Sequence, residues 1–246
     1  PLRQIVRRTA SRAQGPHGTV QRQVLVSHVD TALLVMGLDH DFNPRRLERY
    51  QLLVTQAGLR SVLVLTKADA CTAPLREQRL AQARAVLGLE VPVLAVDGRD
   101  ASTHAALRPW LQPGSTLVLL GSSGAGKSTL TNTLTGLDAA ASGAVRVDDS
   151  RGRHTTTVRT LHTTPEGACI IDTPGLRALR LDLAHEDAVD EAFDDIAHWA
   201  AHCRFRNCRH GDEPGCAVRG EVDAQRLAHW RRLGEEVRRD RLVRRR

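Results

Sequence analysis

Two short motifs in this chain have the residue types and spacing that bind a nucleotide, and the first is a phosphate-binding loop. Gly121-Ser122-Ser123-Gly124-Ala125-Gly126-Lys127-Ser128 follows an apolar run and matches the pattern Gly-x4-Gly-Lys-Ser/Thr. The glycines let backbone N–H groups face phosphate oxygens. Lys127 is predicted to reach the β- and γ-phosphates, and Ser128 to ligate Mg²⁺. The predicted phosphate-binding residues are Gly121, Ser122, Ser123, Gly124, Ala125, Gly126, Lys127, Ser128 and Thr129.

The second motif, Thr66-Lys67-Ala68-Asp69, favours guanine. It resembles the Asn/Thr-Lys-x-Asp motif of GTPases. A carboxylate at Asp69 can accept from both N1–H and the exocyclic amine of guanine, whereas adenine offers neither donor in that arrangement. The Lys67 stem can pack over the ring while its charge stays in water. We therefore expect GTP and GDP to bind. A transporter-type ATPase is a weaker reading, because the chain has no Leu-Ser-Gly-Gly-type signature.

Motif order and two substitutions distinguish this nucleotide site from the usual GTPase pattern. The guanine motif precedes the phosphate loop by about fifty residues, the reverse of the common order. The chain's only lysines, Lys67 and Lys127, lie in these two motifs, which supports both assignments. Thr66 replaces the commoner Asn and predicts a weaker tether between the loops. Ala95-Val96 replaces the expected Ser-Ala pair, so any base contact there would come from backbone N–H.

Candidate switch residues follow the phosphate loop. In Asp172-Thr173-Pro174-Gly175, Asp172 is predicted to hold Mg²⁺ through water, and the Gly175 N–H to meet the γ-phosphate. Between the motifs lies Gly152-Arg153-His154-Thr155-Thr156, where Thr155 is the predicted Mg²⁺ ligand and Thr156 the second choice. Such contacts order a loop with GTP and release it after hydrolysis.

The sequence offers one candidate for the group that positions the attacking water. Leu176 follows Gly175, and an apolar side chain cannot orient water. His154 is a candidate catalytic residue, although a merely solvated histidine is the competing interpretation. We therefore expect slow intrinsic hydrolysis that a partner accelerates.

A cluster of metal-ligand residues lies near the C-terminus. Cys203-x4-Cys208-x-His210-x5-Cys216 supplies three thiolates and one imidazole, which suits a structural, tetrahedral Zn²⁺ with no open position. The charged, turn-rich residues between these ligands could not form a core unaided, so the metal is expected to hold this segment together.

Composition narrows the class of protein. The chain has 246 residues, a formal net charge of +7 and a pI near 9.9, which favour an anionic partner such as nucleic acid over a general arginine bias. It has no long apolar run and no signal-peptide core, so no membrane span is expected. Five cysteines fit a reducing compartment, with Cys71 unligated and Cys169 in the core. The start at Pro1 suggests a partial chain.

The elements that must position these residues alternate between strand-like and helix-like segments. Strands are expected at 23–35, 61–65, 91–96, 116–120 and 168–171, and helices at 44–57, 75–87, 101–111 and 127–134. Such alternation predicts a mostly parallel sheet covered on both faces. Thr66, Gly121 and Asp172 then lie at the carboxyl ends of strands, where ligands collect.

The last segment reads as a basic helix. An apolar stripe is expected from the helical spacing of Val222, Leu227, Trp230, Leu233 and Val237. The arginine-rich tail 238–246 suits an RNA phosphate backbone, and a solvated face is an equal alternative.

With these motifs established, the chain resembles the RsgA (YjeQ) family of circularly permuted GTPases, which assist maturation of the small ribosomal subunit. The resemblance covers about residues 20–235. It rests on the motif order, on Gly-Arg-His-Thr-Thr at 152–156, and on Cys-Arg-Phe-Arg-Asn-Cys-Arg-His-Gly-Asp-Glu-Pro-Gly-Cys-Ala-Val at 203–218. Family members carry a complete OB barrel before the segment 23–30, and residues 1–36 can supply only its last portion.

The prediction is therefore an α/β fold, a circularly permuted P-loop GTPase with a mostly parallel sheet. Residues 1–36 are expected to form the remnant of an OB-type domain, 37–182 the GTPase domain, and 183–246 a zinc-binding α-helical domain with a basic tail. The resemblance implies a cytoplasmic, monomeric GTPase with no membrane partner, which binds ribosomal RNA and is stimulated by the small ribosomal subunit. The alternative is a zinc-dependent RNA-binding protein that uses GTP only as a conformational ligand.

Overall fold

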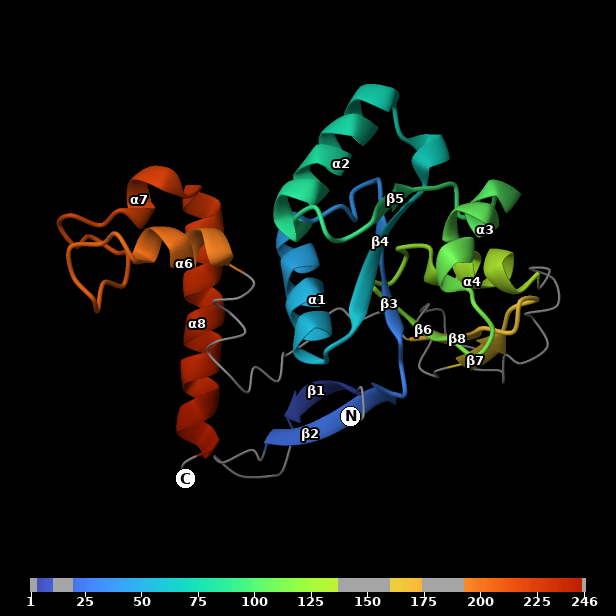
Figure 1. Cartoon of the computed structure of the whole chain (residues 1–246), viewed down its shortest axis with the longest axis horizontal. Coiled ribbons are helices and arrows are strands. Elements are labelled where there is room, and N and C mark those ends of the chain that lie inside the picture. The colour runs from blue at the N-terminus through green and yellow to red at the C-terminus, as the bar shows by residue number, and fades with distance from the viewer. Residues whose placement is uncertain (1–3, 11–19, 137–159, 174–192, 245–246) are drawn as a thin grey trace, which may run out of the picture. The chain divides into compact units, whose positions relative to one another are not determined.

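The computed structural model describes residues 4–10, 20–136, 160–173 and 193–244 (Figure 1). The chain divides into two compact units, Pro1–Leu181 and Asp182–Arg246, each of which is described here by itself. Among the helices in the described ranges, none combines the length and the apolar composition needed to cross a membrane.

The first unit is built on a six-stranded sheet of order β5-β4-β3-β6-β8-β7. Its strands are β3 (Thr31–Gly37), β4 (Arg60–Thr66), β5 (Val93–Ala95), β6 (Thr116–Gly121), β7 (Thr160–Thr163) and β8 (Cys169–Asp172). All neighbours pair in parallel except β7, which runs antiparallel to β8 at one edge. The expected α/β fold with a mostly parallel sheet is confirmed. The short edge strand β7 was not expected from the sequence.

The central strands form because their residues are apolar on both faces. Every residue of β3 is buried, as a parallel strand between two layers of helices requires. Leu33 and Val35 join the core cluster that contains Leu130 and Leu134 of α4. Leu34 and Met36 alternate with them and therefore point to the opposite face.

Two pairs of helices cover the two faces (Figure 1). They are α1 (Pro44–Gln56), α2 (Ala73–Leu87), α3 (Ala101–Leu107) and α4 (Lys127–Thr135). α1 packs on β3 and β4, and α2 packs on β5, whereas α4 packs on β6, β7 and β8. The predicted helix 101–111 is wrong in its last turn: α3 ends at Leu107, and a 3₁₀ turn, Arg108–Trp110, follows around Pro109.

The strand order reverses between β3 and β6. From β3 the chain proceeds outward to β4 and β5. After β6 it goes to the other side, first to the edge strand β7 and then back to β8 beside β6. The carboxyl ends of the parallel strands meet at one edge of the sheet, where Gly37 is in register with Thr66, and Val35 with Gly121. A ligand site is expected in the crevice at such a switch point.

The N-terminal segment forms a separate antiparallel pair, β1 (Gln4–Ala10) and β2 (Val20–Ser27). The single extended segment predicted over residues 23–35 is wrong, because a turn at His28, with φ of 57°, separates β2 from β3. β3 pairs within the six-stranded sheet, so residues 31–36 lie in that sheet rather than with the hairpin. The division into an OB remnant, a GTPase domain and a zinc domain stays a prediction.

The second unit contains α6 (Asp194–Ala200), α7 (Val218–Glu221) and α8 (Ala224–Arg244). The Asp223 carboxylate caps α8 by accepting from the N–H groups of Gln225 and Arg226, both at 3.0 Å. Leu227 and Leu233 are buried as the predicted stripe requires. Val222 is also buried but precedes the helix, and the side chain of Val237 lies outside the described residues.

Candidate nucleotide-binding site and metal centre

The phosphate loop connects the end of β6 at Gly121 to the start of α4 at Lys127. Gly124 and Gly126 have φ of 83° and 91°, which favour glycine. A Cβ on Gly126 would lie 3.2 Å from the Thr66 hydroxyl, and one on Gly121 would collide with the Val35 carbonyl. The glycines are therefore needed for backbone conformation and for close approach to β3 and β4.

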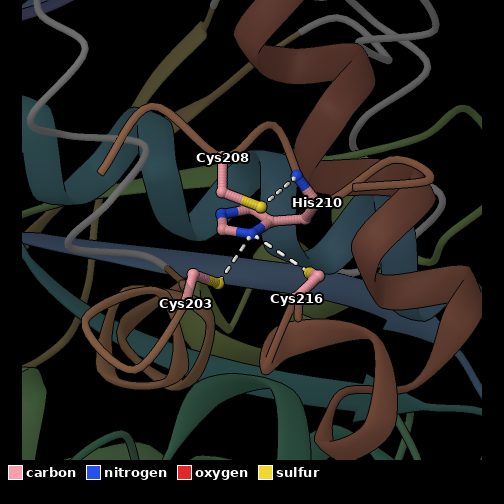
Figure 2. Close-up of side chains that lie close together, drawn as sticks. All are labelled: Cys203, Cys208, His210 and Cys216. Atoms are coloured by element: carbon pink, nitrogen blue, oxygen red, sulfur yellow. Dashed lines mark hydrogen bonds between the residues drawn. The ribbon is translucent and has the colours of Figure 1, made fainter. Parts of the chain in front are cut away.

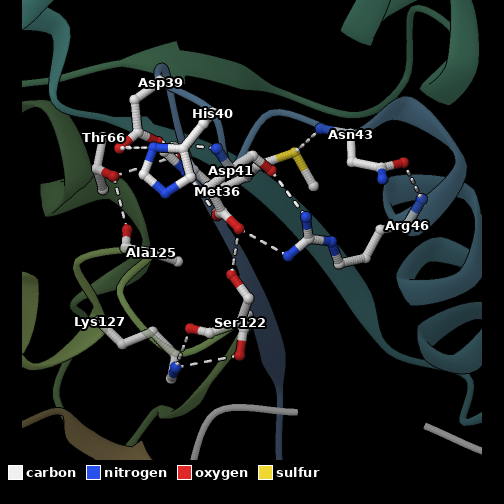
Figure 3. Close-up of polar contacts among 12 residues, drawn as sticks. Met36, Asp39, His40, Asp41, Asn43, Arg46, Thr66, Ser122, Ala125 and Lys127 are labelled. Carbon is white, nitrogen blue, oxygen red and sulfur yellow. Dashed lines mark hydrogen bonds and ion pairs between the residues drawn. The ribbon is translucent and has the colours of Figure 1, made fainter. Parts of the chain in front are cut away.

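Lys127 lies inside this loop and is 6% exposed. Its ammonium donates to the carbonyls of Gly121, at 3.0 Å, and Ser122, at 2.7 Å (Figure 3). Burial lowers the pKa of Lys127, and the carboxylates of Asp172 and Asp41 oppose that shift. The loop thus holds a buried ammonium against its own carbonyls, and an ammonium is the kind of charged donor that a phosphate site requires.

Ser128 and Asp172 meet beside the loop. The Ser128 hydroxyl donates to Asp172 Oδ2 at 3.0 Å, while Asp172 Oδ1 is buried without a hydrogen-bond partner among the described residues. Burial raises the pKa of Asp172, which opposes the effects of the Ser128 hydrogen bond and the Lys127 charge. A hydroxyl and an unsatisfied carboxylate oxygen are hard oxygen ligands, so these residues fit Mg²⁺.

The guanine motif begins at the last residue of β4. The Thr66 hydroxyl donates to the Ala125 carbonyl of the phosphate loop at 2.6 Å (Figure 3). Thr66 therefore does link the two loops, through one hydrogen bond. That this tether is weaker than one made by Asn stays a prediction. Asp69 is exposed in the 3₁₀ turn Ala68–Ala70, where its carboxylate is free to meet a base.

The segment Ala95-Val96 closes the same region. The Val96 carbonyl accepts from the Ala68 N–H at 3.1 Å, and the Val96 N–H donates to the Leu65 carbonyl at 2.8 Å. The Val96 N–H is therefore already hydrogen-bonded within the protein, and a backbone contact from this segment to the base stays a prediction. The segment also supports the backbone of the guanine motif.

A third element at this edge, residues 37–43 between β3 and α1, was missed from the sequence. We call it the β3–α1 loop. Asp39 pairs with the Lys67 ammonium at 2.8 Å. Asp41 accepts from the Ser122 hydroxyl at 2.5 Å and from Arg46 at 2.7 Å. The available signal was two carboxylates directly after a buried strand, whose carboxyl end must lie at the ligand edge.

Of the predicted switch residues, Asp172 is described above and the others are not among the described residues. His154, Thr155, Thr156, Gly175 and Leu176 lie outside the described residues. Their proposed roles in Mg²⁺ binding and hydrolysis stay predictions.

The second unit brings the four predicted metal ligands together (Figure 2). The ligand atoms of Cys203, Cys208, His210 and Cys216 all lie within 4.8 Å of one another. His210 Nδ1 is 3.5 Å from Cys203 Sγ and 3.6 Å from Cys216 Sγ. Tetrahedral zinc with ordinary Zn–S and Zn–N bonds separates such ligand atoms by about 3.6 Å. The donor set and its spacing therefore fit zinc.

Surrounding groups fix the orientation of these ligands. The backbone N–H of His210 donates to Cys208 Sγ at 3.4 Å. The centroid of the His210 ring lies 5.3 Å from that of the Trp230 ring on α8. Burial raises the pKa of the Cys203 thiol, but backbone N–H groups of Ala217 and Val218 outweigh it and lower the pKa overall. Donors aimed at a sulfur favour the thiolate, the form that binds metal.

Cys71 and Cys169 stand apart from this cluster. Both are free and half-buried, and neither belongs to the ligand group found within the described residues. The expectation of a core position for Cys169 is wrong. Ile170 and Asp172 alternate with it and take the buried positions of β8.

Solved structures identify the fold. The chain matches the YloQ crystal structure, described as a circularly permuted GTPase, with a TM-score of 0.61 at 24% identity, covering 95% of this chain and 79% of that one. YjeQ from Thermotoga maritima matches with a TM-score of 0.59 at 21% identity, covering 89% and 78% of the two chains. The fold and the motif order together define the class as circularly permuted P-loop GTPases.

Sequence comparison identifies the family within this class. The model of the RsgA GTPase family matches residues 4–182, and the chain belongs to that family. It is 49% identical over 242 residues to the "Small ribosomal subunit biogenesis GTPase RsgA" of Xanthomonas euvesicatoria pv. vesicatoria, covering 96% of this chain and 64% of the relative. The Xylella fastidiosa 9a5c protein of the same name is 50% identical over 248 residues, covering 96% and 68%. The chain thus spans about two thirds of the length of these relatives.

Proposed function

We propose that this protein is a GTP hydrolase acting in biogenesis of the small ribosomal subunit. The observation that carries the proposal is the convergence of Lys127, Ser128, Asp172 and the Thr66–Asp69 motif at the switch point between β3 and β6. One edge of the sheet thereby supplies a phosphate cradle, a hard-cation site and a guanine carboxylate. ATP binding would leave the Asp69 carboxylate without its two guanine donors.

Each residue has a distinct task in this proposal. Lys127 and the loop N–H groups bind and orient the phosphates. Ser128 and Asp172 would hold Mg²⁺, and the ion when bound would supply positive charge next to the phosphates. Asp69 selects the base and Lys67 covers it. Thr155 and Gly175 are the proposed γ-phosphate sensors, and His154 is the proposed group that orients water.

The partner is inferred from the relatives, whose printed name assigns them to the small ribosomal subunit. We extend that role to this chain as a cytoplasmic monomer that binds the subunit through ribosomal RNA. The second unit, held by Zn²⁺ at Cys203, Cys208, His210 and Cys216, is the proposed RNA-binding part. Its charge supports this role, because the sequence from residue 238 onward is rich in arginine.

Base recognition is tested by exchanging the base and the carboxylate together. Asp69→Asn replaces an acceptor by an amide that can donate to the 2-carbonyl of xanthine. We expect GDP affinity to fall by about a hundredfold and XDP affinity to rise, measured by competition against a fluorescent nucleotide. Asp100→Asn is the matched control, since Asp100 caps α3 and Asn also caps a helix. Unchanged GDP affinity in Asp69→Asn would remove the guanine assignment.

Turnover separates the hydrolase from its alternative. We expect slow GTP hydrolysis by the protein alone and strong stimulation by purified small ribosomal subunits. Lys127→Ala should abolish both rates, because the loop loses its buried ammonium. Subunit binding that depends on GTP without any stimulated turnover would instead identify a zinc-dependent RNA-binding protein that uses GTP as a conformational ligand.

A further inference from the structure

The β3–α1 loop touches both halves of the candidate nucleotide site. Its Asp39 reaches the guanine motif through Lys67, at 2.8 Å. Its Asp41 reaches the phosphate loop through Ser122, at 2.5 Å (Figure 3). The loop leaves the sheet from β3, directly beside β6, where the strand order reverses. It therefore lies at the crevice where a nucleotide would bridge the two halves of the sheet.

We propose that the β3–α1 loop positions the nucleotide-binding groups, with Asp41 acting on phosphate binding through Ser122 and Asp39 acting on base binding through Lys67. Neither aspartate belongs to the motifs that define the site. The inference rests on the proposed guanine-nucleotide function and names two further residues that set its affinity.

Asp41 is built into the protein as a buried, fully committed carboxylate. It is 9% exposed; Oδ1 accepts from Ser122 and Arg46, and Oδ2 accepts from the Gly37 N–H at 3.1 Å. Arg46 also donates to the Asp41 carbonyl at 2.9 Å. A buried charge persists only when it is paired and hydrogen-bonded, and Arg46 meets that requirement here. The rigid part of this contact is therefore the Asp41 side, and Ser122 is the group being held.

Ser122 transmits this restraint to the phosphate-binding ammonium. Its hydroxyl is held by Asp41, while its carbonyl accepts from Lys127 Nζ at 2.7 Å. Gly124 and Gly126 follow in the phosphate loop, and glycine restricts the backbone less than any other residue does. An external anchor at Ser122 reduces that freedom before phosphate binds, which improves affinity through preorganisation.

Asp39 acts on base binding through Lys67, and its effect on affinity is expected to be the smaller of the two. Its side chain and that of Lys67 are 27% and 35% exposed. Burial raises the pKa of Asp39, but the Lys67 contact and the Asp41 N–H lower it overall, so the carboxylate stays charged. Lys67 has φ of 62°, and the ion pair fixes the direction of its side chain. Because both groups are partly solvated, removal of Asp39 should cost less than removal of Asp41.

Gly37 makes this arrangement possible. A Cβ at that position would lie 2.5 Å from Asp39 Oδ1 and 3.4 Å from the Asp41 Cβ. Glycine at this position therefore leaves room for the Asp39 carboxylate in the position that it takes here, and a larger residue would make that carboxylate shift. The Leu38 N–H then donates to the Thr66 carbonyl at 2.8 Å, which joins the loop to the guanine motif.

The test compares GDP with GMP, since the ratio of their affinities isolates the contribution of the β-phosphate. Affinities are measured on the full chain by competition against N-methylanthraniloyl-GDP. We expect Asp41→Asn to lower the GDP:GMP affinity ratio about tenfold. Ser122→Ala should match that loss, and the double variant should lose no more, because the two residues act as one unit. Asp39→Asn should weaken GDP and GMP by the same factor, about threefold, and leave the ratio unchanged.

The matched control is Asp30→Asn. Asp30 precedes β3 and accepts from the Thr116 N–H of β6 at 2.9 Å, the same kind of contact at the opposite end of the same two strands. We expect it to leave both affinities unchanged. A general loss of stability would weaken GDP and GMP equally in every variant, which would overturn the proposal. If Asp41→Asn fails to fold, Ser122→Ala alone tests the proposal. An unchanged GDP:GMP affinity ratio in Ser122→Ala would then overturn it.

The design separates this inference from the proposed function. If the wild-type protein binds no guanine nucleotide, both fail. If it binds GDP but Asp41→Asn and Ser122→Ala retain the wild-type ratio, only the role of the β3–α1 loop is wrong.

Discussion

Each unit of this protein is stabilised internally by a different kind of interaction. The first has a core of wholly buried strands, in which β3 exposes no residue and helices cover both faces. The second has a few buried apolar side chains, a Cys₃His cluster and a two-pronged ion pair between Arg226 and Asp195, at 2.6 and 2.7 Å. Stability in the first unit therefore comes from apolar burial, whereas the second unit, with the zinc proposed above, would depend on polar and metal-ligand contacts.

This difference explains where ligands can act in the molecule. In the first unit the apolar core is complete without a nucleotide, so buried polar groups such as Lys127 and Asp172 can be kept ready at one edge. In the second unit the metal ligands lie in the segment between α6 and α7, which has little else to hold it. Binding of the proposed zinc there would contribute directly to folding.

Metal removal gives the largest expected effect. Cys208→Ser, or chelation, should remove a metal whose binding contributes about 10–16 kcal/mol in small zinc domains, and unfold the second unit. Zinc content, far-UV circular dichroism and tryptophan fluorescence measure the loss. GDP affinity should change less than about twofold. The same loss should lower ribosome-stimulated turnover.

Cys71→Ser is the control for that experiment, since Cys71 is half-buried and lies outside the cluster. It should keep a full equivalent of zinc. Native zinc content and helicity in Cys208→Ser would show that the cluster is not what holds the second unit.

The next largest expected effect is on the stability of the first unit, when a substitution creates a cavity beside the sheet. Leu34 is 0% exposed, so Leu34→Ala should lower the free energy of unfolding by about 2–5 kcal/mol. Leu161, which is 67% exposed on β7, is the control, and Leu161→Ala should cost less than about 0.5 kcal/mol. Hydrogen exchange followed by mass spectrometry locates the change. Equal loss of protection in α8 would contradict the separation of the units.

Asp172 in the first unit and Asp195 in the second have pKa shifts of opposite direction, so the stabilities of the two units should respond to pH in opposite ways. Burial raises the pKa of Asp172, so its charge destabilises the folded protein above that pKa, and the cost vanishes as pH falls below it. Asp172→Asn should therefore stabilise the nucleotide-free protein at pH 7 by about 1 kcal/mol, with the gain shrinking at acid pH, while GTP hydrolysis is lost. Urea unfolding between pH 4 and pH 8 measures it. A gain that grows as pH falls would reverse the argument.

Asp195 should behave in the opposite way. Burial alone would raise the pKa of Asp195, but Arg226 overcomes this and lowers it. The pair therefore stabilises the second unit above the ordinary aspartate pKa, and the contribution is lost as pH falls through the lowered value. Asp195→Asn should destabilise the unit by about 1 kcal/mol at pH 7, discounted for partial exposure. Arg219→Gln, in an exposed pair with Asp212 at 3.5 Å, should have no measurable effect on urea unfolding.

The smallest expected effect is the loss of a helix N-cap, which can be compared in both units. Asn43 caps α1 and Asp223 caps α8. Replacement of either by Ala should cost about 0.5–1 kcal/mol, whereas Asn43→Asp and Asp223→Asn should be nearly neutral because both keep an acceptor. Hydrogen exchange in each helix provides the measurement. Loss of the α8 cap should also make zinc easier to remove with a chelator, since helix and metal stabilise the same unit.

Local sequence signals predicted the parts of this structure that are fixed over short distances. Continuous apolar runs predicted β4 and β6 and thereby placed Thr66 and Gly121 at strand ends. The spacing of Cys203, Cys208, His210 and Cys216 predicted a cluster, because four ligands within fourteen residues need only short turns to meet.

Other features depend on partners distant in the chain or on weak local patterns. Asp41 and Ser122 are 81 residues apart, and nothing near Asp41 announces that contact. The hydrogen bond from Thr66 to Ala125 likewise joins residues 59 positions apart, so the local sequence does not show it. The strand β7 has half-exposed and exposed residues without an apolar run, and the break at His28 has neither Gly nor Pro to mark it.

The reversal of strand order between β3 and β6 has a consequence for synthesis. The three strands on one side of that boundary, β3, β4 and β5, are consecutive in the chain, as are their covering helices α1 and α2. A growing polypeptide therefore completes the half that carries Asp39, Asp41 and the guanine motif before the phosphate loop is translated. The β6 strand then adds to an exposed edge of β3, which gives the nascent chain an unpaired edge that a chaperone could cover until Gly121 arrives.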